Sequence, residues 1–234
     1  MTKYALECNN CTVSYPDFHL SFSFNVKEGE LVCIIGPSGS GKSTLLSTIC
    51  GLEKLSSGNI SIKGRNVTTL PTEKRRVGMV FQDFALFPHL NTEQNVAFAV
   101  KGNKAVKKET ADFFLKMTGL TGFNKRDVST LSGGEKQRVA LARTLAFDPD
   151  LLLFDEALSS VDVLLKKSLR KTIKDIQQKT GKAAVYVTHD TEEALEIADR
   201  IIVLHNGLIE QIGTPEEIIN NPATDFVKQF ILCK

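Results

Sequence analysis

The sequence predicts an α/β fold with a mostly parallel sheet, an antiparallel β segment before it and a lobe of helices. Three observations predict this arrangement. Strand patterns alternate with helical patterns over the second half of the chain. Residues 3–14 and 20–35 have the pattern of short strands joined by a turn at Pro16-Asp17. The helical patterns between residues 92 and 147 have no strand between them, which predicts a separate lobe.

Short apolar runs bounded by turn residues predict the strands of the sheet. The run at 31–35 precedes a glycine-rich turn, and the fully apolar run at 151–154 ends in carboxylates. Asn206-Gly207 joins the last two runs and is typical of a tight hairpin. Further strands are predicted at 59–62, 77–81, 183–187, 200–205 and 208–212.

Helical spacing and capping residues predict the helices. Thr92 and Asn103 are the expected N-caps of the region 92–118, and Gly102 and Gly119 are its expected stops. Other helices are predicted at 42–50, 132–147, 163–179 and 191–198, with short ones after Pro215. We expect one domain over residues 1–234, with an α/β core at 1–90 and 148–234 and a helical lobe at about 91–147.

Composition and charge exclude several classes of protein. The chain has 234 residues and a net charge of only +2, which argues against a nucleic-acid partner. Its apolar runs fall far short of the ~20 residues that a membrane-spanning helix needs. No charged-then-apolar leader precedes Tyr4, so we expect a chain that is not exported and that meets a membrane only through a partner.

The segment Gly36-Pro37-Ser38-Gly39-Ser40-Gly41-Lys42-Ser43-Thr44 is the centre of the predicted site. It has the spacing G-x-x-x-x-G-K-[ST] of a phosphate-binding loop, between a predicted strand and a predicted helix. The glycines let successive N–H groups point inward, and the helix N-terminus adds a positive dipole end. Lys42 is suited to the β- and γ-phosphates and Ser43 to Mg²⁺. A glycine-rich turn without a ligand is disfavoured by this context, and we expect a nucleoside triphosphate.

Polar residues follow several predicted strands. Asp155 and Glu156 come after a buried strand, where ligands bind in α/β sheets. Asp155 is suited to orienting Mg²⁺, and Glu156 to acting as general base on a water. Gln82 is able to contact both Mg²⁺ and a water, and His189 to bond a phosphate oxygen or hold the base. Each taken alone is compatible with a structural role, but four at strand ends indicate one site.

Three features have two interpretations on local pattern alone. Tyr15 is either a core aromatic or a ring that stacks on a purine. The apolar segment from Phe84 to Leu90 either packs into the core or forms a socket for another protein. Cys8 and Cys11 form a C-x-x-C pair without a second Cys or His pair, so buried or spare thiols are favoured over a metal or redox site.

The segment Leu131-Ser132-Gly133-Gly134-Glu135-Lys136-Gln137-Arg138 places a serine and two glycines at a predicted helix N-terminus. This is a second anion site without a lysine. One nucleotide has no use for two such helix ends unless they come from different subunits. The segment is similar to the signature motif of the ATP-binding cassette family, and the resemblance covers essentially the whole chain.

That resemblance implies roles for individual residues and two ligands, ATP and Mg²⁺. Tyr15 is similar to the aromatic that stacks on adenine, and Gln82 to the glutamine of the family's glutamine loop. Asp155, Glu156 and His189 resemble the metal-orienting aspartate, the catalytic glutamate and the switch histidine. Asp162 matches a loop that crosses the dimer interface, although Ala157 stands where this loop usually begins with proline.

By the same resemblance two copies pair head to tail, and each ATP lies between the Lys42 loop of one copy and Ser132, Gly133 and Gly134 of the other. The stretch from Arg75 to Phe98 is similar to bacterial importers of polyamines, sulfate, molybdate, iron, thiamine or maltose-type sugars. In these, the region of Phe84 to Leu90 receives a helix of the membrane subunit. The resemblance therefore implies permease subunits, an extracytoplasmic substrate-binding protein, and a peripheral location at the cytoplasmic face of the inner membrane.

The resemblance leaves other kinds of cassette ATPase open. An efflux or lipid-export ATPase is the nearest alternative, and a soluble cassette ATPase, for example in iron–sulfur assembly, is another. Many importer relatives carry a further C-terminal β domain, which we expect to be missing here. The transported substrate is not encoded in these residues, because the permease and the binding protein select it.

Overall fold

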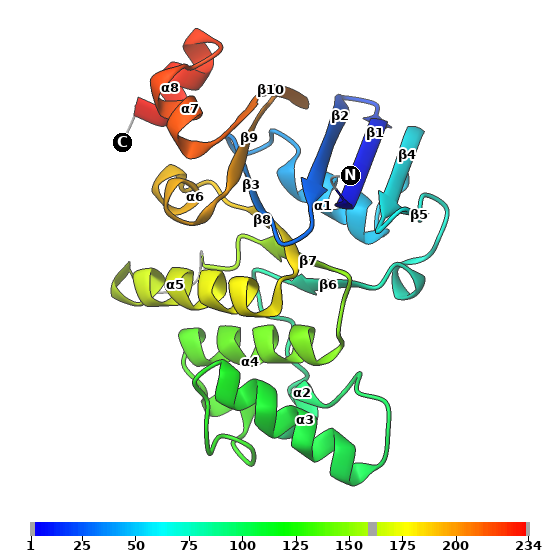
Figure 1. The fold of residues 1–234 in the computed structure, drawn as a ribbon, viewed down its shortest axis with the longest axis vertical. Helices are drawn as coiled ribbons and strands as arrows, with labels where there is room; N and C mark the ends of the chain where they lie inside the picture. The colour runs from blue at the N-terminus through cyan, green and yellow to red at the C-terminus, as the bar shows by residue number, and fades with distance from the viewer. Residues whose placement is uncertain (1–2, 159–162, 233–234) are drawn as a thin grey trace.

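The computed structural model describes residues 3–158 and 163–232. In this part of the chain ten strands form one mixed sheet, with helices on both of its faces (Figure 1). The order across the sheet is β5-β4-β1-β2-β10-β9-β3-β8-β7-β6. The predicted α/β class is confirmed. The strands are β1 (Tyr4–Tyr15), β2 (Phe18–Lys27), β3 (Leu31–Ile35), β4 (Ser57–Ile62), β5 (Arg65–Asn66), β6 (Val77–Val80), β7 (Leu151–Asp155), β8 (Ala183–Val187), β9 (Arg200–His205) and β10 (Leu208–Gly213).

The helices follow the strands along the chain as the alternating pattern predicts. The α-helices are α1 (Lys42–Cys50), α2 (Thr92–Val96), α3 (Lys104–Met117), α4 (Gly133–Ala146), α5 (Val163–Thr180), α6 (Thr191–Ile197), α7 (Pro215–Asn220) and α8 (Asp225–Leu232). Two single turns of 3₁₀-helix, η1 (Thr72–Lys74) and η2 (Val128–Thr130), precede β6 and α4.

Half of the sheet is parallel. Strands β9, β3, β8, β7 and β6 run in one direction, so their carboxyl ends share one edge. Every residue of β3 and β8 is buried, because helices or strands cover both faces of these central strands. The polar residues that follow β6, β7 and β8 therefore all emerge at the same edge.

The other half of the sheet is mainly antiparallel. Strands β1 and β2 form a long hairpin, and β4 and β5 extend it on the far side. Strand β10 joins the halves, pairing antiparallel with β9 and parallel with β2. The predicted turn at Asn206-Gly207 links β9 to β10, and both of its residues have positive φ, 46° and 76°.

Different elements cover the two faces of the parallel strands. On one face α1 packs with the antiparallel strands, through Leu45, Leu46 and Ile49. On the other face lie α4, α5, α6, α7 and α8, which pack on alternate residues of the same strands, such as Cys33 and Phe154. The phosphate-loop helix is thus enclosed between the two halves of the sheet and has one fixed position.

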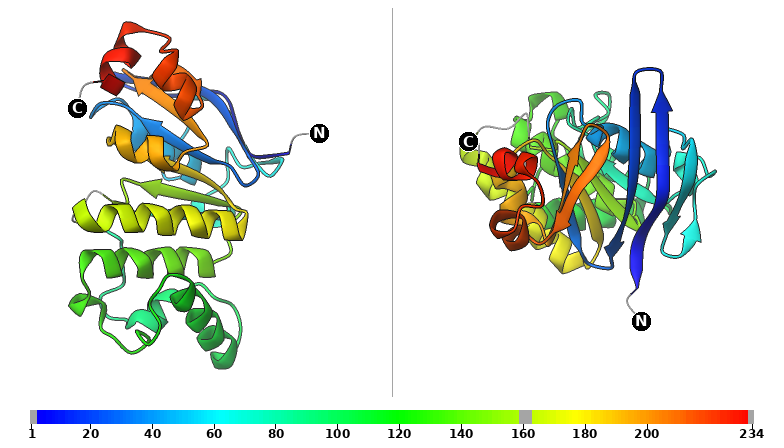
Figure 2. Two further views of the ribbon diagram at one scale, coloured as in Figure 1. Left: turned by 60° about the vertical axis from the view of Figure 1, so that its left-hand side comes forward. Right: turned by 90° about the horizontal axis from the view of Figure 1, so that it is seen from above.

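Helices α2, α3 and α4 lie together beyond α5, at the end of the molecule opposite α7 and α8 (Figures 1 and 2). They share a small apolar core of their own, which includes Val96, Leu115 and Val139. Two expectations for this region were wrong. Asn91, not Thr92, caps α2, because its side chain accepts from the Gln94 N–H. Helix α2 ends at Val96, well before Gly102.

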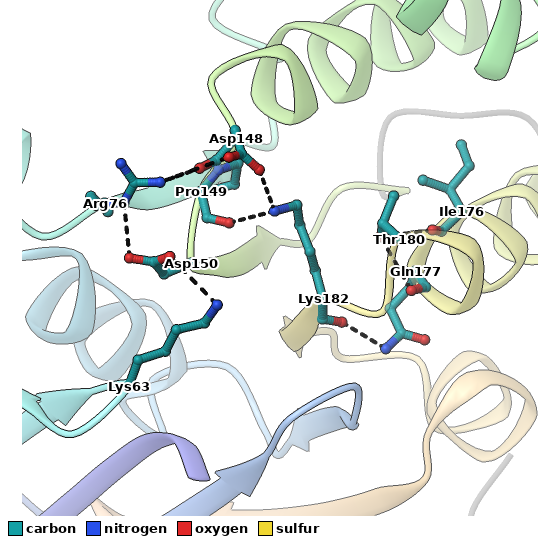
Figure 3. Close-up of polar contacts among 9 residues, drawn as sticks. All are labelled: Lys63, Arg76, Asp148, Pro149, Asp150, Ile176, Gln177, Thr180 and Lys182. Atoms are coloured by element: carbon teal, nitrogen blue, oxygen red, sulfur yellow. Dashed lines mark hydrogen bonds and ion pairs between the residues drawn. The ribbon is translucent and has the colours of Figure 1, made fainter. Parts of the chain in front are cut away.

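Charged residues form ion pairs at the edge of the sheet where the parallel strands β6, β7 and β8 begin (Figure 3). The Lys182 ammonium donates to Asp148 at 2.7 Å and to the Pro149 carbonyl at 2.8 Å. The Arg76 guanidinium binds Asp150 at 2.9 Å, and Lys63 lies 3.6 Å from the same carboxylate. These contacts join the starts of β6, β7 and β8 to the β4–β5 turn, at the edge that faces away from the phosphate loop.

A buried arginine connects α1 to the strand that leads to Gln82. The Arg75 guanidinium donates to four main-chain carbonyls, those of Thr48 and Ile49 in the last turn of α1 and those of Thr68 and Leu70. Burial lowers its pKa. A positive charge at a helix C-terminus interacts favourably with the helix dipole. Arg75 therefore holds the far end of the phosphate-loop helix.

Replacing Arg75 by methionine is expected to lower stability strongly, because four carbonyls lose their donor. The expected loss is about 2–4 kcal/mol, which corresponds to a fall in melting temperature of roughly 5–15 °C for a chain of this size. Thermal unfolding by circular dichroism measures it. The matched control is Arg76→Met, which removes exposed ion pairs and is expected to shift the melting temperature by only about 1–3 °C. Equal shifts for the two variants would contradict the role of Arg75.

Candidate functional site

The phosphate loop curls between the end of β3 and the start of α1. Gly39 and Gly41 have φ values of 79° and 102°, a conformation that favours glycine. At Gly36 a Cβ atom would lie 2.0 Å from the Leu204 carbonyl oxygen, so no side chain fits there. The N–H of Gly207, in the β9–β10 turn, donates to the Ser40 carbonyl at 3.1 Å. The loop is therefore held by the hairpin turn as well as by its own helix.

Lys42 lies inside this loop. Its side chain is 5% exposed, and its ammonium donates to the carbonyls of Gly36 and Pro37, both at 2.8 Å. Burial lowers its pKa, while the nearby Glu156 and Asp155 carboxylates act in the opposite direction. A cation held by neutral carbonyls in a buried loop is suited to an exchange of these partners for a phosphate anion.

A cavity of about 330 Å³ opens over the loop. Its lining consists of Phe18, Ser38, Gly39, Gly41, Lys42, Ser43, Thr44 and Glu156. The Ser40 hydroxyl is buried here and has no hydrogen-bond partner, which is expensive unless a ligand supplies one. Of the seven residues 38–44, six thus line one hollow, and the seventh, Ser40, has a buried hydroxyl without a hydrogen-bond partner.

Asp155 stands beside the loop at the carboxyl end of β7. Its Oδ1 accepts a hydrogen bond from the Ser43 hydroxyl at 3.2 Å, and burial raises the pKa of its carboxyl group. Gln82 and Asp155 line a neighbouring hollow of about 400 Å³. A hydroxyl, a carboxylate and an amide oxygen are the ligand types that Mg²⁺ prefers. The three predicted metal ligands fit such an ion.

Glu156 and His189 face each other across the strand ends. His189 Nδ1 lies 3.1 Å from Glu156 Oε2, and the Glu156 N–H donates to the Val187 carbonyl at 3.0 Å. Glu156 has a φ of 44°, a strained conformation for a non-glycine residue. The structure brings together the carboxylate and the imidazole that the sequence predicted, with Glu156 also lining the phosphate cavity.

Ser132, Gly133 and Gly134 lie at the N-terminus of α4. The Ser132 hydroxyl accepts from the Glu135 N–H, and the Glu135 carboxylate accepts from the Ser132 N–H at 2.8 Å. This capping box fixes the helix end. None of the three residues is among those described as lining the phosphate cavity of the same chain. Their contact with a nucleotide held by a second copy stays a prediction.

Tyr15 lies at the end of β1. Its hydroxyl donates to Glu53 at 2.6 Å, and the side chain is 43% exposed. Phe18, at the start of β2, lines the phosphate cavity, and its ring would touch a Cβ atom at Gly41. Stacking of Tyr15 on a purine stays a prediction, and Phe18 is a second aromatic at this entrance that the local pattern did not single out as a ligand.

The segment from Phe84 to Leu90 only partly matches either interpretation. Phe84 is 8% exposed and packs in the core, but it also contributes to the lining of a neighbouring hollow, so the socket for another protein stays a prediction. Phe84 and Ala85 have φ values of 65° and 44°, and Arg143 of α4 donates to both of their carbonyls. Leu86, Pro88 and Lys136 line a hollow of about 270 Å³ beside them. Phe84 thus anchors the segment from within.

Two further predicted features have a simple outcome. Asp162 lies outside the described residues, while Ala157, at the start of the same loop, is buried in the core. Cys8 and Cys11 are buried free thiols, and in residues 3–158 and 163–232 no group of three His, Cys, Asp or Glu side chains surrounds a metal position.

Comparison with known proteins identifies the family. The family described as ABC transporter matches residues 20–159. The chain belongs to this family. The resemblance predicted from its signature segment is confirmed. Within the described residues the ABC transporter chain has no helix that is both long and apolar enough to cross a membrane.

Curated relatives of this ABC transporter chain include two import proteins. The spermidine/putrescine import ATP-binding protein PotA of Bacteroides fragilis is 47% identical over 212 residues, covering 89% of this chain and 46% of PotA. The sulfate/thiosulfate import ATP-binding protein CysA of Bacillus cereus is 45% identical over 222 residues, covering 92% of this chain and 61% of CysA. The chain therefore spans about half to two thirds of the length of the curated relatives it matches.

Solved structures agree on the fold. A dimeric, post-hydrolysis structure of the ATP-binding cassette MJ0796 bound to ADP and Pi is 33% identical, with a TM-score of 0.77, and the alignment covers 90% of this chain and 98% of that one. CbiO1 from Clostridium perfringens, part of the ABC transporter complex cbiONQ, is 29% identical, with a TM-score of 0.84 over 92% of this chain and 90% of that one.

Replacing Asp155 by asparagine is expected to stabilise the nucleotide-free chain. Because the pKa of this carboxyl group is raised in the folded chain, ionising the group costs more free energy in the folded chain than in the unfolded chain. The group therefore destabilises the fold at pH values above its ordinary pKa of 3.8. The variant keeps an oxygen for the Ser43 hydroxyl. We expect a melting temperature about 1–3 °C higher at pH 7.5. The difference in melting temperature between the variant and the unsubstituted chain should shrink as the pH falls through the folded pKa towards 3.8. A lower melting temperature of the variant at pH 7.5 would contradict this account.

Proposed function

We propose that this chain is the ATP-binding and ATP-hydrolysing subunit of an importer. The observation that carries the proposal is the Glu156–His189 pair, 3.1 Å apart, at the rim of a cavity formed by the phosphate loop. A phosphate loop alone binds a nucleotide, whereas a carboxylate and an imidazole beside it are suited to activating a water. The relatives PotA and CysA are both import ATP-binding proteins, which supports import.

In this proposal each residue at the strand ends has one task. Glu156 accepts a proton from the attacking water, and His189 holds the Glu156 carboxylate and reaches the terminal phosphate. Lys42 exchanges its carbonyl partners for phosphate oxygens, and the main-chain N–H groups of residues 38–44 bind the remaining oxygens. Gln82 orients the water from the next strand. Tyr15 stacks on the adenine ring at the open side of the loop.

The proposed Mg²⁺ site consists of Ser43, Gln82 and Asp155. The Ser43 hydroxyl and the Asp155 carboxylate are 3.2 Å apart and point to the same space. The ion supplies charge compensation for the phosphate oxygens when it is bound. The ion would add a second positive charge beside Asp155, next to that of Lys42.

We further propose that two copies of the chain close over two ATP molecules. The positions of Ser132, Gly133 and Gly134, away from the phosphate cavity of their own chain, support this proposal. The MJ0796 structure, which is dimeric, supports it as well. Asp162 is assigned to the interface loop on its sequence position alone.

The remaining partners follow from the importer assignment. Permease subunits would dock beside Leu86, Phe87, Pro88 and Leu90, with an extracytoplasmic binding protein in the full system. The chain would then act as a peripheral protein at the cytoplasmic face of the inner membrane. We also propose one cassette domain over residues 1–234, with residues 91–147 as its helical lobe. An export or iron–sulfur assembly ATPase is favoured by no feature of the described residues.

Replacing Glu156 by glutamine tests the proposed chemistry. The amide cannot accept the proton, so turnover is expected to fall by at least about 100-fold, while ATP affinity stays within about threefold because Lys42 and the loop are intact. Phosphate release and the binding of a fluorescent ATP analogue measure the two quantities. Glu192→Gln, an exposed carboxylate on α6, is the control and keeps full turnover. Near-normal turnover of Glu156→Gln would exclude the general-base role.

Replacing Ser132 by arginine tests the shared site. The long side chain blocks the helix end that faces the other copy's ATP, so turnover is expected to fall by at least about 100-fold. Each chain keeps its own phosphate loop and still binds the nucleotide. Ser129→Arg, at an exposed position three residues earlier, is the control. Retained turnover in Ser132→Arg would mean that each chain hydrolyses ATP alone.

A further inference from the structure

A buried carboxyl group lies directly beneath the His189 segment. Glu193, in the first turn of α6, is 3% exposed and has no place in the chemistry proposed above. Burial raises the pKa of its carboxyl group. A carboxylate in such a position is costly unless several donors satisfy it, so its partners indicate what it does.

Both oxygens of Glu193 accept short hydrogen bonds, one from strand β8 and one from the residue that follows it. The Tyr186 hydroxyl donates to Oε1 at 2.6 Å, and the Thr188 hydroxyl donates to Oε2 at 2.6 Å. Tyr186 and Thr188 are themselves almost completely buried. The carboxyl group therefore joins the first turn of α6 to the end of β8, at the point where the chain leaves the sheet towards His189.

The contacts continue on both sides of His189. The Thr188 hydroxyl accepts from the Asp190 N–H at 3.0 Å, and the Asp190 carboxylate accepts from the Glu193 N–H at 3.1 Å. Residues 188 and 190 are thus both fixed to Glu193. The His189 side chain between them is 55% exposed, and its ring bonds Glu156. The imidazole is therefore accessible, while hydrogen bonds hold the main chain on both sides of it.

Helix α5 supplies the positive charge of this cluster. The Arg170 guanidinium lies 2.7 Å from the Glu196 carboxylate and 3.7 Å from that of Asp190. The Glu196 and Asp190 side chains are partly exposed, which limits what these ion pairs contribute to stability. What such a cluster does provide is a single geometry for the groups that it joins.

We propose that Glu193 is a positioning residue, which sets the His189 main chain so that the imidazole reaches Glu156. This inference rests on the proposed function, because it concerns the same pair of residues. Glu193 touches no reacting atom and acts through Thr188 and Asp190. Its length decides the effect, since both hydroxyls must be reached at the same time.

Two conservative substitutions separate length from charge. Glu193→Asp keeps the charge but withdraws both oxygens by one methylene, so neither 2.6 Å hydrogen bond can form as it stands. Glu193→Gln keeps the length. Its oxygen accepts from Thr188, and its amide donates to the Tyr186 oxygen. We expect turnover to fall about tenfold in Glu193→Asp, because small misplacements of catalytic groups are costly, and to stay within about threefold in Glu193→Gln.

The experiment measures kcat for ATP hydrolysis, the Kd of a fluorescent ATP analogue and the melting temperature for both variants. The control is Glu192→Gln, the exposed neighbour in the same turn. A positioning role predicts a lower kcat in Glu193→Asp with an unchanged Kd. Unchanged kcat in Glu193→Asp would overturn the proposal. So would equal losses of kcat in both variants, because Glu193→Gln keeps the length that the proposal requires.

A second measurement excludes a purely structural role. Glu193→Asp is also made in a His189→Ala background, and single-turnover hydrolysis of radiolabelled ATP measures the rate. In this background Glu193→Asp should cause no further loss of hydrolysis rate, because the side chain that Glu193 positions is gone. The same tenfold loss in both backgrounds would overturn the proposal. Full turnover of His189→Ala alone would instead contradict the proposed function. The failure of one proposal is therefore distinguishable from the failure of the other.

Discussion

Burial of the central parallel strands on both faces is the constraint on which the rest of the structure depends. Strands β3 and β8 have no exposed residue, so they have one register and one direction. Polar residues are excluded from their length and occur where the strands end. Since the strands are parallel, these ends lie at one edge. The phosphate loop, Asp155, Glu156 and His189 meet there for this reason.

The two edges of the parallel strands use charge in different ways. At the amino-terminal edge, Lys182, Arg76 and Lys63 are paired with Asp148 and Asp150, so opposite charges are matched (Figure 3). At the carboxyl-terminal edge burial raises the pKa of Asp155 and lowers the pKa of Lys42. Shifted pKa values that gather at one place are typical of a site that binds ligands.

Supporting contacts reach the site from several distant segments. Arg75 holds the C-terminal turn of α1, the N-H of Gly207 binds the phosphate loop, and Glu193 fixes the main chain on both sides of His189. Arg143 holds two strained residues that follow Gln82. Each contact holds main chain next to a residue of the site. Such an arrangement fixes the geometry of the site while its side chains still exchange partners.

The sequence by itself determined the α/β class, the phosphate loop, the four strand-end residues and the family. These features depend on local spacing, such as apolar runs of five residues and the interval from Gly36 to Lys42, which one stretch of chain contains in full. The tertiary structure alone decided that Phe84 belongs to the core, that Phe18 lines the phosphate cavity and that Glu193 lies beneath His189. An aromatic or a glutamate has the same local pattern whether it is buried or exposed. Its environment is set by elements far away in the sequence, because burial depends on which segments pack against each other.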